Sequence, residues 1–167
     1  MMKNNQKEQK NKKVCFAAST GGHFEQLMML KPLMKKYDSF IVTEKTKYSV
    51  NKNSQYKTYC LKQVNRKEIT FPINMIINFF KSLYIFIKEK PDYMITTGVL
   101  AIIPMALIVK LFGKKLIYIE SFAKISSPTQ SGKFLYKKAD RFYVQWEKML
   151  EFYPNAVYKG GIYWWYS

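Results

Sequence analysis

Short apolar runs alternate along the chain with longer amphipathic stretches. The runs that we expect to form strands cover residues 14–18, 40–42, 58–61, 92–96, 116–119 and 141–144. Apolar residues at helical spacing predict helices around residues 27–34 and over 73–87, 99–112, 132–138 and 147–152. Several strands are apolar on both faces, which is typical of a parallel sheet covered on both sides. The pattern predicts a Rossmann-like, doubly wound α/β domain.

Prolines and glycines mark the ends of these elements. Pro72 stands where the helix over 73–87 begins, and Gly113 follows the helix over 99–112, which contains Pro104. The polar stretch 44–57 is expected to be a loop. We see no internal repeat and no second domain. We therefore expect a basic flexible tail over 1–13 and a single domain over 14–167.

Composition narrows the function classes. The chain has 167 residues, and its apolar fraction of 48% supplies a core, which excludes wholesale disorder. We expect room for only half of a two-domain sugar- or dinucleotide-handling enzyme. Cys15 and Cys60 lie inside apolar runs, and His23 is the only histidine, so we predict neither a disulfide framework nor a metal site. Residues 1–13 lack an apolar signal segment, which favours a cytoplasmic protein.

The formal net charge of +17 indicates either an anionic partner or a bias in composition. Nucleic acid, an anionic membrane surface and anionic small molecules are the three candidate partners, and a composition bias toward Lys and Asn is the alternative. Proteins that recognise nucleic-acid sequence rely mainly on arginines that make two hydrogen bonds to one base. This chain has two arginines, Arg66 and Arg141. The charge therefore favours surface contacts, and we expect no nucleic-acid partner. A filter-binding assay over a salt series would test that expectation.

Candidate chemistry gathers where the predicted strands end. In a parallel sheet, ligands bind at the carboxyl ends of the strands. Four segments meet there on this topology: residues 19–23, 96–98, 120–121 and the pair Gly160–Gly161. Gly21 and Gly22 allow a tight turn and a close backbone approach to phosphate, although the turn could also be purely structural.

Two titratable residues stand out at this edge. His23 lies in the first turn of a helix, where the dipole favours a neutral imidazole that can accept a proton. A capping or packing histidine is the alternative. Glu120 ends an apolar strand, where a buried carboxylate is costly unless it has a partner or a task. A salt bridge to a lysine is the alternative there.

Two predicted helices are candidates for membrane contact. The helix over 73–87 carries apolar residues beyond a single stripe, but polar residues interrupt it, and 99–112 is too short to span a bilayer. We expect one of them, or the basic tail, to lie at the membrane surface. Burial in the core is the alternative, and for 99–112 it is the favoured one.

Several segments resemble a known family. Residues 116–123 (LIYIESFA), 139–147 (ADRFYVQWE) and 153–158 (YPNAVY) are similar to bacterial polysaccharide-biosynthesis proteins of the PssD/CpsF type. They also resemble the membrane-anchoring subunit of the eukaryotic two-subunit N-acetylglucosaminyltransferase of the ALG family. The turn over 19–23 (STGGH) looks like the acceptor-side loop of MurG, which forms lipid II. The likeness covers about residues 13–163.

This resemblance implies the N-terminal, acceptor-side half of a GT-B glycosyltransferase. The chain would supply acceptor binding and membrane recruitment in capsular or exopolysaccharide biosynthesis. A separate donor-binding subunit of similar size would hold most of the UDP-sugar, and neither a metal nor another cofactor is implied. The acceptor would be an undecaprenyl-diphosphate-linked saccharide at the cytoplasmic face of the membrane. The eukaryotic subunit has an N-terminal membrane helix, whereas this tail is polar and basic, so we expect peripheral attachment.

The resemblance also implies roles for individual residues. His23 and Glu120 are the catalytic candidates. The residues expected to contact the acceptor or its phosphates are Ser19, Thr20, Gly21, Gly22, Thr97, Gly98 and Ser121. The aromatic end, Tyr163, Trp164, Trp165 and Tyr166, is expected to meet the partner subunit, with packing on its own core as the alternative. A non-catalytic membrane adaptor that recruits a separate transferase is the alternative function.

Overall fold

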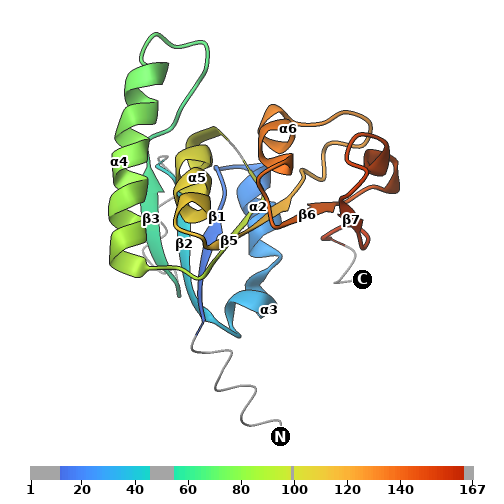
Figure 1. Cartoon of the computed structure of the whole chain (residues 1–167), viewed down its shortest axis with the longest axis horizontal. Helices are drawn as coiled ribbons and strands as arrows, with labels where there is room; N and C mark the ends of the chain where they lie inside the picture. The colour runs from blue at the N-terminus through green and yellow to red at the C-terminus, as the bar shows by residue number, and fades with distance from the viewer. Residues whose placement is uncertain (1–11, 46–54, 99, 164–167) are drawn as a thin grey trace, which may run out of the picture.

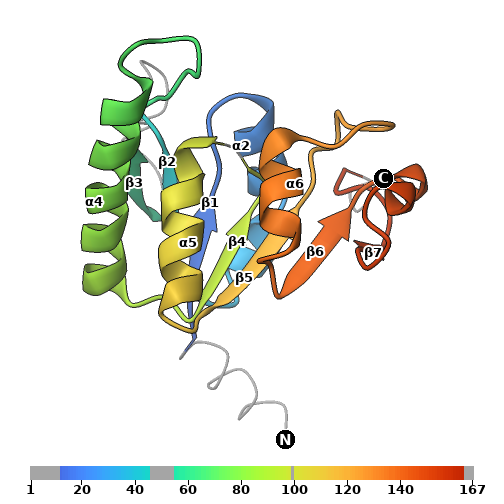
Figure 2. The same cartoon turned by 45° about the horizontal axis from the view of Figure 1, so that its top comes forward.

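In the part of the chain that the structure describes, seven strands form one parallel sheet in the order β3-β2-β1-β4-β5-β6-β7 (Figure 1 and Figure 2). This computed structural model describes residues 12–45, 55–98 and 100–163. The strands are β1 (Lys13–Ala17), β2 (Asp38–Glu44), β3 (Lys57–Leu61), β4 (Tyr93–Thr96), β5 (Lys115–Ile119), β6 (Arg141–Val144) and β7 (Val157–Tyr158). The order reverses between β1 and β4, as in a Rossmann fold. The predicted fold class is confirmed.

Helices cover the sheet on two sides (Figure 2). The α-helices are α2 (Gly22–Met28), α3 (Lys31–Met34), α4 (Phe71–Glu89), α5 (Ile103–Leu111) and α6 (Gln130–Tyr136). Side chains of β1 alternate between two buried clusters. Cys15 and Ala17 join α4, α5 and α6, whereas Val14 and Phe16 join α2 and α3. Burial of β1 on both faces explains its continuous apolar run.

Three predicted helices differ in detail from the observed ones. The stretch around 27–34 forms two short helices, because Pro32 occupies the first turn of α3 and cannot continue the hydrogen-bond ladder of α2. The segment after Gly98 begins with a 3₁₀ turn, η1 (Leu100–Ile102), ahead of α5, which starts with Pro104 in its first turn. The last predicted helix is the 3₁₀ turn η2 (Glu147–Glu151). Lys13, assigned above to the tail, is the first residue of β1, and residues 1–11 lie outside the described chain.

Most of helix α5 is buried, as favoured above, although Leu107 and Leu111 are exposed, whereas α4 turns much of its apolar surface outward. The outer face of α4 consists of the exposed side chains of Ile73, Ile76, Phe80, Tyr84 and Ile87. Its inner side carries buried Ile85 and Phe86 together with buried Asn78, Ser82 and Glu89. Large apolar side chains of α4 therefore face solvent, which is unusual for a surface helix, while its buried side combines Ile85 and Phe86 with three polar residues.

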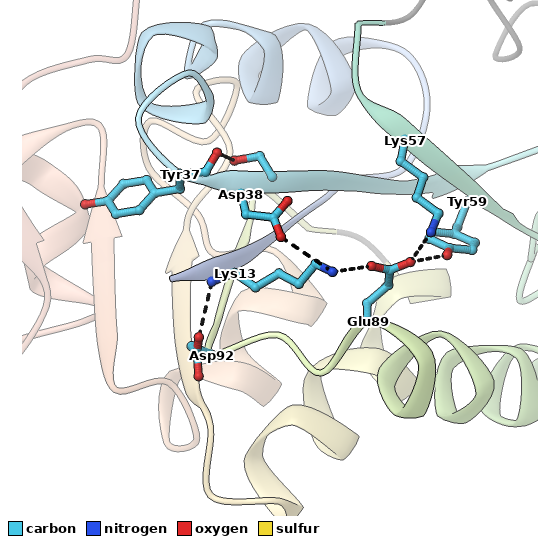
Figure 3. Close-up of polar contacts among 8 residues, drawn as sticks. Lys13, Tyr37, Asp38, Lys57, Tyr59, Glu89 and Asp92 are labelled. Carbon is cyan, nitrogen blue, oxygen red and sulfur yellow. Dashed lines mark hydrogen bonds and ion pairs between the residues drawn. The ribbon is translucent and has the colours of Figure 1, made fainter. Parts of the chain in front are cut away.

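An ion-pair cluster closes the amino edge of the sheet (Figure 3). Glu89, at the end of α4, is 2.7 Å from Lys13 Nζ and also accepts hydrogen bonds from Lys57 and Tyr59. Burial by itself would raise the pKa of Glu89, but these donors outweigh it and lower the pKa to about 2. The cluster joins α4 to β1 and β3 at the edge opposite the strand ends that carry the candidate site.

Candidate functional site

The carboxyl edge of the sheet brings the predicted segments together. The glycine turn (residues 19–23) follows β1 and contacts the end of β4, where Ser19 N donates to Gly98 O at 3.1 Å. Thr97 Oγ1 donates to His23 O at 2.8 Å. The segment after β5 joins them through Phe122 N, which donates to Gln26 Oε1 of α2 at 3.0 Å. The topology thus assembles one site from loops that are far apart in sequence.

Only part of the predicted acceptor set is open to solvent. Gly21 and Gly22 are exposed, and Thr20 and His23 are partly exposed. Gly21 has φ +70, a conformation that favours glycine, and a Cβ built on either glycine would meet nothing within 4 Å. In contrast, the side chains of Ser19, Thr97 and Ser121 are buried, as is Gly98. Thr97 and Gly98 bond to the turn, since Thr97 Oγ1 donates to His23 O and Gly98 O accepts from Ser19 N.

His23 has a defined tautomer. Its Nδ1 lies 2.7 Å from Thr97 O, and because a carbonyl oxygen only accepts, Nδ1 carries the proton. The neutral ring therefore keeps the lone pair on Nε2. Burial lowers the pKa of His23, and the Thr97 carbonyl and the charge of Glu120 offset this only in part. The ring is thus a neutral proton acceptor near pH 7.

Glu120 is fully buried, and hydrogen bonds hold both carboxylate oxygens. Oε1 accepts from Ser121 N at 2.8 Å and from Thr129 Oγ1 at 2.8 Å, while Oε2 accepts from Tyr153 OH at 2.8 Å. Thr129 is the N-cap of α6, where its hydroxyl accepts from Gly132 N at 2.8 Å. The carboxylate therefore fixes the β5 loop and the start of α6, and it acts on the turn through its field on His23.

A buried network of side-chain amides contacts α2, the helix that follows the glycine turn. The sequence pattern did not predict this network. Gln145 Nε2 donates to Gln26 Oε1 at 2.9 Å and to Glu120 O at 2.8 Å, and Gln145 Oε1 accepts from Ile162 N at 2.9 Å. The network joins α2, the β5 loop and the C-terminal segment. The available signal was the uncharged polar residue that directly follows the apolar strand β6.

Glu44 is a second missed residue at this edge. It ends β2, and its side chain is buried, so it repeats the signal that singled out Glu120. The polar pattern instead predicts that Glu44 begins the loop over 44–57.

The aromatic C-terminal end is described only up to Tyr163, because residues 164–167 lie outside the described chain. Tyr163 is 36% exposed, and its ring packs edge-on against Phe122 at 5.0 Å. Trp146 Nε1 also donates to Phe122 O, at 2.6 Å. The start of the aromatic end thus lies beside the β5 loop, and Tyr163 remains partly exposed there.

The described residues show neither a metal-binding cluster nor a membrane-spanning helix. No three His, Cys, Asp or Glu side chains within 12–45, 55–98 and 100–163 are grouped so that they could hold a metal ion. In the same segments, no helix combines the length and apolarity needed to cross a bilayer.

The family model and the related sequences that match this chain all name Alg14. Residues 13–162 match the family described as "Oligosaccharide biosynthesis protein Alg14 like". The human UDP-N-acetylglucosamine transferase subunit ALG14 is 25% identical over 177 residues, which cover 89% of this chain and 82% of the human protein. The subunit from Yarrowia lipolytica is 26% identical, over 90% of this chain and 81% of its own length.

Solved structures share the fold at low sequence identity. MurG of Acinetobacter baumannii superposes with a TM-score of 0.69 at 16% identity, over 82% of this chain and 42% of that one. UDP-N-acetylglucosamine 2-epimerase of Rickettsia bellii superposes with a TM-score of 0.69 at 13% identity, over 91% and 45%. This chain therefore spans less than half the length of these two enzymes, and the likeness concerns the fold alone.

Proposed function

Because the chain belongs to the Alg14-like family of oligosaccharide biosynthesis proteins, we propose that it is the acceptor-side subunit of a bipartite inverting glycosyltransferase. The matched relatives are named as subunits of a UDP-N-acetylglucosamine transferase, and one Rossmann-like unit is half of a GT-B enzyme such as MurG. A second chain would bind most of the UDP-sugar. The acceptor would be an undecaprenyl-diphosphate-linked saccharide of capsular or exopolysaccharide biosynthesis.

The 2.7 Å contact between His23 Nδ1 and Thr97 O is the observation that carries this proposal. In the reaction, an acceptor hydroxyl attacks the anomeric carbon, the bond from that carbon to the UDP oxygen breaks, and UDP leaves with the bonding electrons. The hydroxyl proton moves to Nε2, which is free to accept it because Nδ1–H is bonded to Thr97 O. A positioned base of this kind contributes roughly 10²–10⁴ in rate. The open backbone at Gly21 and Gly22 would face the acceptor diphosphate.

Replacement of His23 tests the catalytic role. In the reconstituted two-chain enzyme, His23→Ala is expected to lower turnover by about tenfold or more, the lower part of the range for a general base. Glu25→Ala, an exposed change on the same helix, is the matched control and should leave turnover unchanged. Circular dichroism and melting temperature would show that both variants are folded. Undiminished turnover in His23→Ala would instead assign the chain the role of a non-catalytic membrane adaptor.

We also propose that the outer face of α4 makes the peripheral membrane contact at the cytoplasmic face. Ile73 and Phe80 are 61% and 63% exposed, and exposed apolar side chains in a continuous row favour burial in a partner or a lipid interface. Lys81 and Lys88 flank the face, and each would contribute about 1 kcal/mol near anionic lipid. Exposed Ile69 extends the row toward the carboxyl edge of the sheet, so a lipid-linked acceptor would reach the glycine turn from the same side.

A further inference from the structure

Two buried glutamines join the C-terminal segment to the helix that carries His23. Gln26 of α2 and Gln145, directly after β6, are 5% and 2% exposed. Gln145 Nε2 donates to Gln26 Oε1 at 2.9 Å, and Gln145 Oε1 accepts from Ile162 N at 2.9 Å. One side chain therefore bonds to α2 through its nitrogen and to the C-terminal segment through its oxygen.

The backbone fixes the orientation of both amides. Ile162 N–H can only donate, and the Glu120 carbonyl, 2.8 Å from Gln145 Nε2, can only accept, so the Gln145 amide has one possible orientation. Gln26 must present its oxygen to the network, because Phe122 N also donates to Oε1, at 3.0 Å. Leucine at either position would have a similar size but would make none of these bonds.

Gln26 lies close to the proposed base along α2. Residues three apart are neighbours on the surface of a helix, and Gln26 follows His23 by three. His23 itself is bonded to the end of β4, since Nδ1 lies 2.7 Å from Thr97 O and Thr97 Oγ1 donates to His23 O at 2.8 Å. A shift of α2 at the glutamine end would therefore tilt the imidazole away from the Thr97 carbonyl.

The C-terminal segment reaches the same network a second time through Phe122. The ring of Tyr163 packs edge-on against Phe122 at 5.0 Å, and the Trp146 ring packs against it at 4.9 Å. Phe122 N is in turn a donor to Gln26 Oε1. Residues 162 and 163 thus contact the network at two neighbouring points, one through a backbone N–H and one through a ring.

We propose that Gln145 and Gln26 are positioning residues for His23 and that they couple the C-terminal segment to its imidazole. This inference rests on the proposed function, because it takes His23 as the base and the aromatic end as the interface with the donor-binding subunit. Docking of that subunit would hold Ile162 against Gln145 and favour the bonded position of α2. The base would then be held most firmly in the assembled enzyme.

Nuclear magnetic resonance of the imidazole tests the coupling without a partner or a ligand. His23 is the only histidine, so the full chain without a histidine tag gives one imidazole signal, and its nitrogen shifts show which nitrogen carries the proton. In the wild type we expect the proton on Nδ1. Gln145→Leu and Gln26→Leu should lower the ratio of the Nδ1–H form to the Nε2–H form about fivefold or more, the lower end of the usual range for coupled sites.

Asn78 provides the matched control. Its amide is also completely buried, and it accepts from Lys62 N and donates to Lys62 O, both at 2.8 Å, but it belongs to α4. A merely structural role for the glutamines predicts that all three leucine variants lose stability and keep the tautomer. A positioning role predicts that Asn78→Leu loses stability alone. An unchanged ratio in either glutamine variant would overturn the inference, and if one variant does not fold, the other decides.

Proline at position 162 tests the C-terminal half of the coupling at a single atom. Ile162→Pro removes the N–H that donates to Gln145 Oε1 and leaves both glutamines in place. It should lower the tautomer ratio in the same direction as the glutamine variants, whereas Ile162→Val, which keeps the N–H, should not. A wild-type ratio in Ile162→Pro would overturn the coupling to the C-terminal segment.

Turnover of the reconstituted two-chain enzyme tests the functional part. Gln145→Leu should lower kcat about tenfold, less than the roughly hundredfold loss for a group misplaced by about 1 Å. The KM for the UDP-sugar should stay the same, because the other subunit holds most of the donor. Equal kcat would overturn the positioning role in catalysis. If His23→Ala keeps full turnover while the tautomer ratios change as expected, His23 is not the base, and the positioning of its ring by Gln145 stands.

Discussion

Gly132 packs against the buried Glu120 network, so adding one methyl group tests whether that network is rigid. A Cβ at this position would lie 2.1 Å from Glu120 Oε2, 2.6 Å from Tyr153 OH and 2.8 Å from Thr129 Oγ1. Two of these partners, Glu120 and Tyr153, are almost completely buried. Thr129 and Tyr153 each donate a hydrogen bond to Glu120, so none of the three can move aside without breaking a bond.

Opposing effects determine how much Gly132→Ala changes the free energy of unfolding. Alanine in place of glycine within a helix gains up to about 1 kcal/mol. Overpacking a filled site costs about 1–3 kcal/mol, and losing one hydrogen bond to a buried charge costs about 1.5–3 kcal/mol. The losses dominate, and we expect the free energy of unfolding to fall by about 2–4 kcal/mol. For a domain of this size, the melting temperature should then fall by roughly 5–15 °C.

Thermal and urea unfolding, followed by circular dichroism, would measure this effect. Gly22→Ala is the matched control, since Gly22 also lies in the first turn of a helix but a Cβ there meets nothing within 4 Å. Its melting temperature should stay the same or rise slightly. If Gly132→Ala is as stable as wild type, the Glu120 network is not the rigid support described here.

Three further predictions concern other parts of the molecule. In the folded protein the pKa of Glu89 is lowered to about 2, so its ion pairs contribute stability that is present above pH about 4.5 and is lost as the pH falls toward 2. Glu89→Gln should remove this contribution. The prediction is contradicted if the free energy of unfolding of the variant, measured between pH 2 and 7, depends on pH as steeply as that of the wild type. Phe80→Ser with Tyr84→Ser should reduce sedimentation with anionic vesicles about tenfold, whereas Phe152→Ser, an exposed aromatic away from α4, should not; equal sedimentation would exclude the outer face of α4. Deletion of residues 163–167 should abolish co-purification with the donor-binding subunit, and an intact complex would remove the aromatic end from the interface.

The sequence was sufficient for the order of the elements and for the place of the site. The apolar run 14–18 occurs where β1 is buried on both faces, and the run 116–119 occurs where one face of β5 is buried and the other half-buried, so the sequence pattern alone predicted the position of both strands. Pro72 predicted the start of α4, and Gly98 and Gly113 predicted turns that have positive φ in the structure. The carboxyl ends of parallel strands share one edge, so the grouping of the glycine turn with Gly98 also followed from the pattern.

Tertiary contacts decided the chemistry of each site residue. Periodicity shows that one side of α4 is apolar, but only packing shows that water rather than the sheet covers it. The tautomer of His23 depends on a carbonyl 74 residues away, and the burial of Glu120 depends on Tyr153, 33 residues away. Glu44 was placed in a loop because nothing local shows that β2 extends to it and that Val64 N donates to it. Local sequence specifies backbone preference and apolar spacing, whereas hydrogen bonding and burial are set by segments that meet only when the sheet forms.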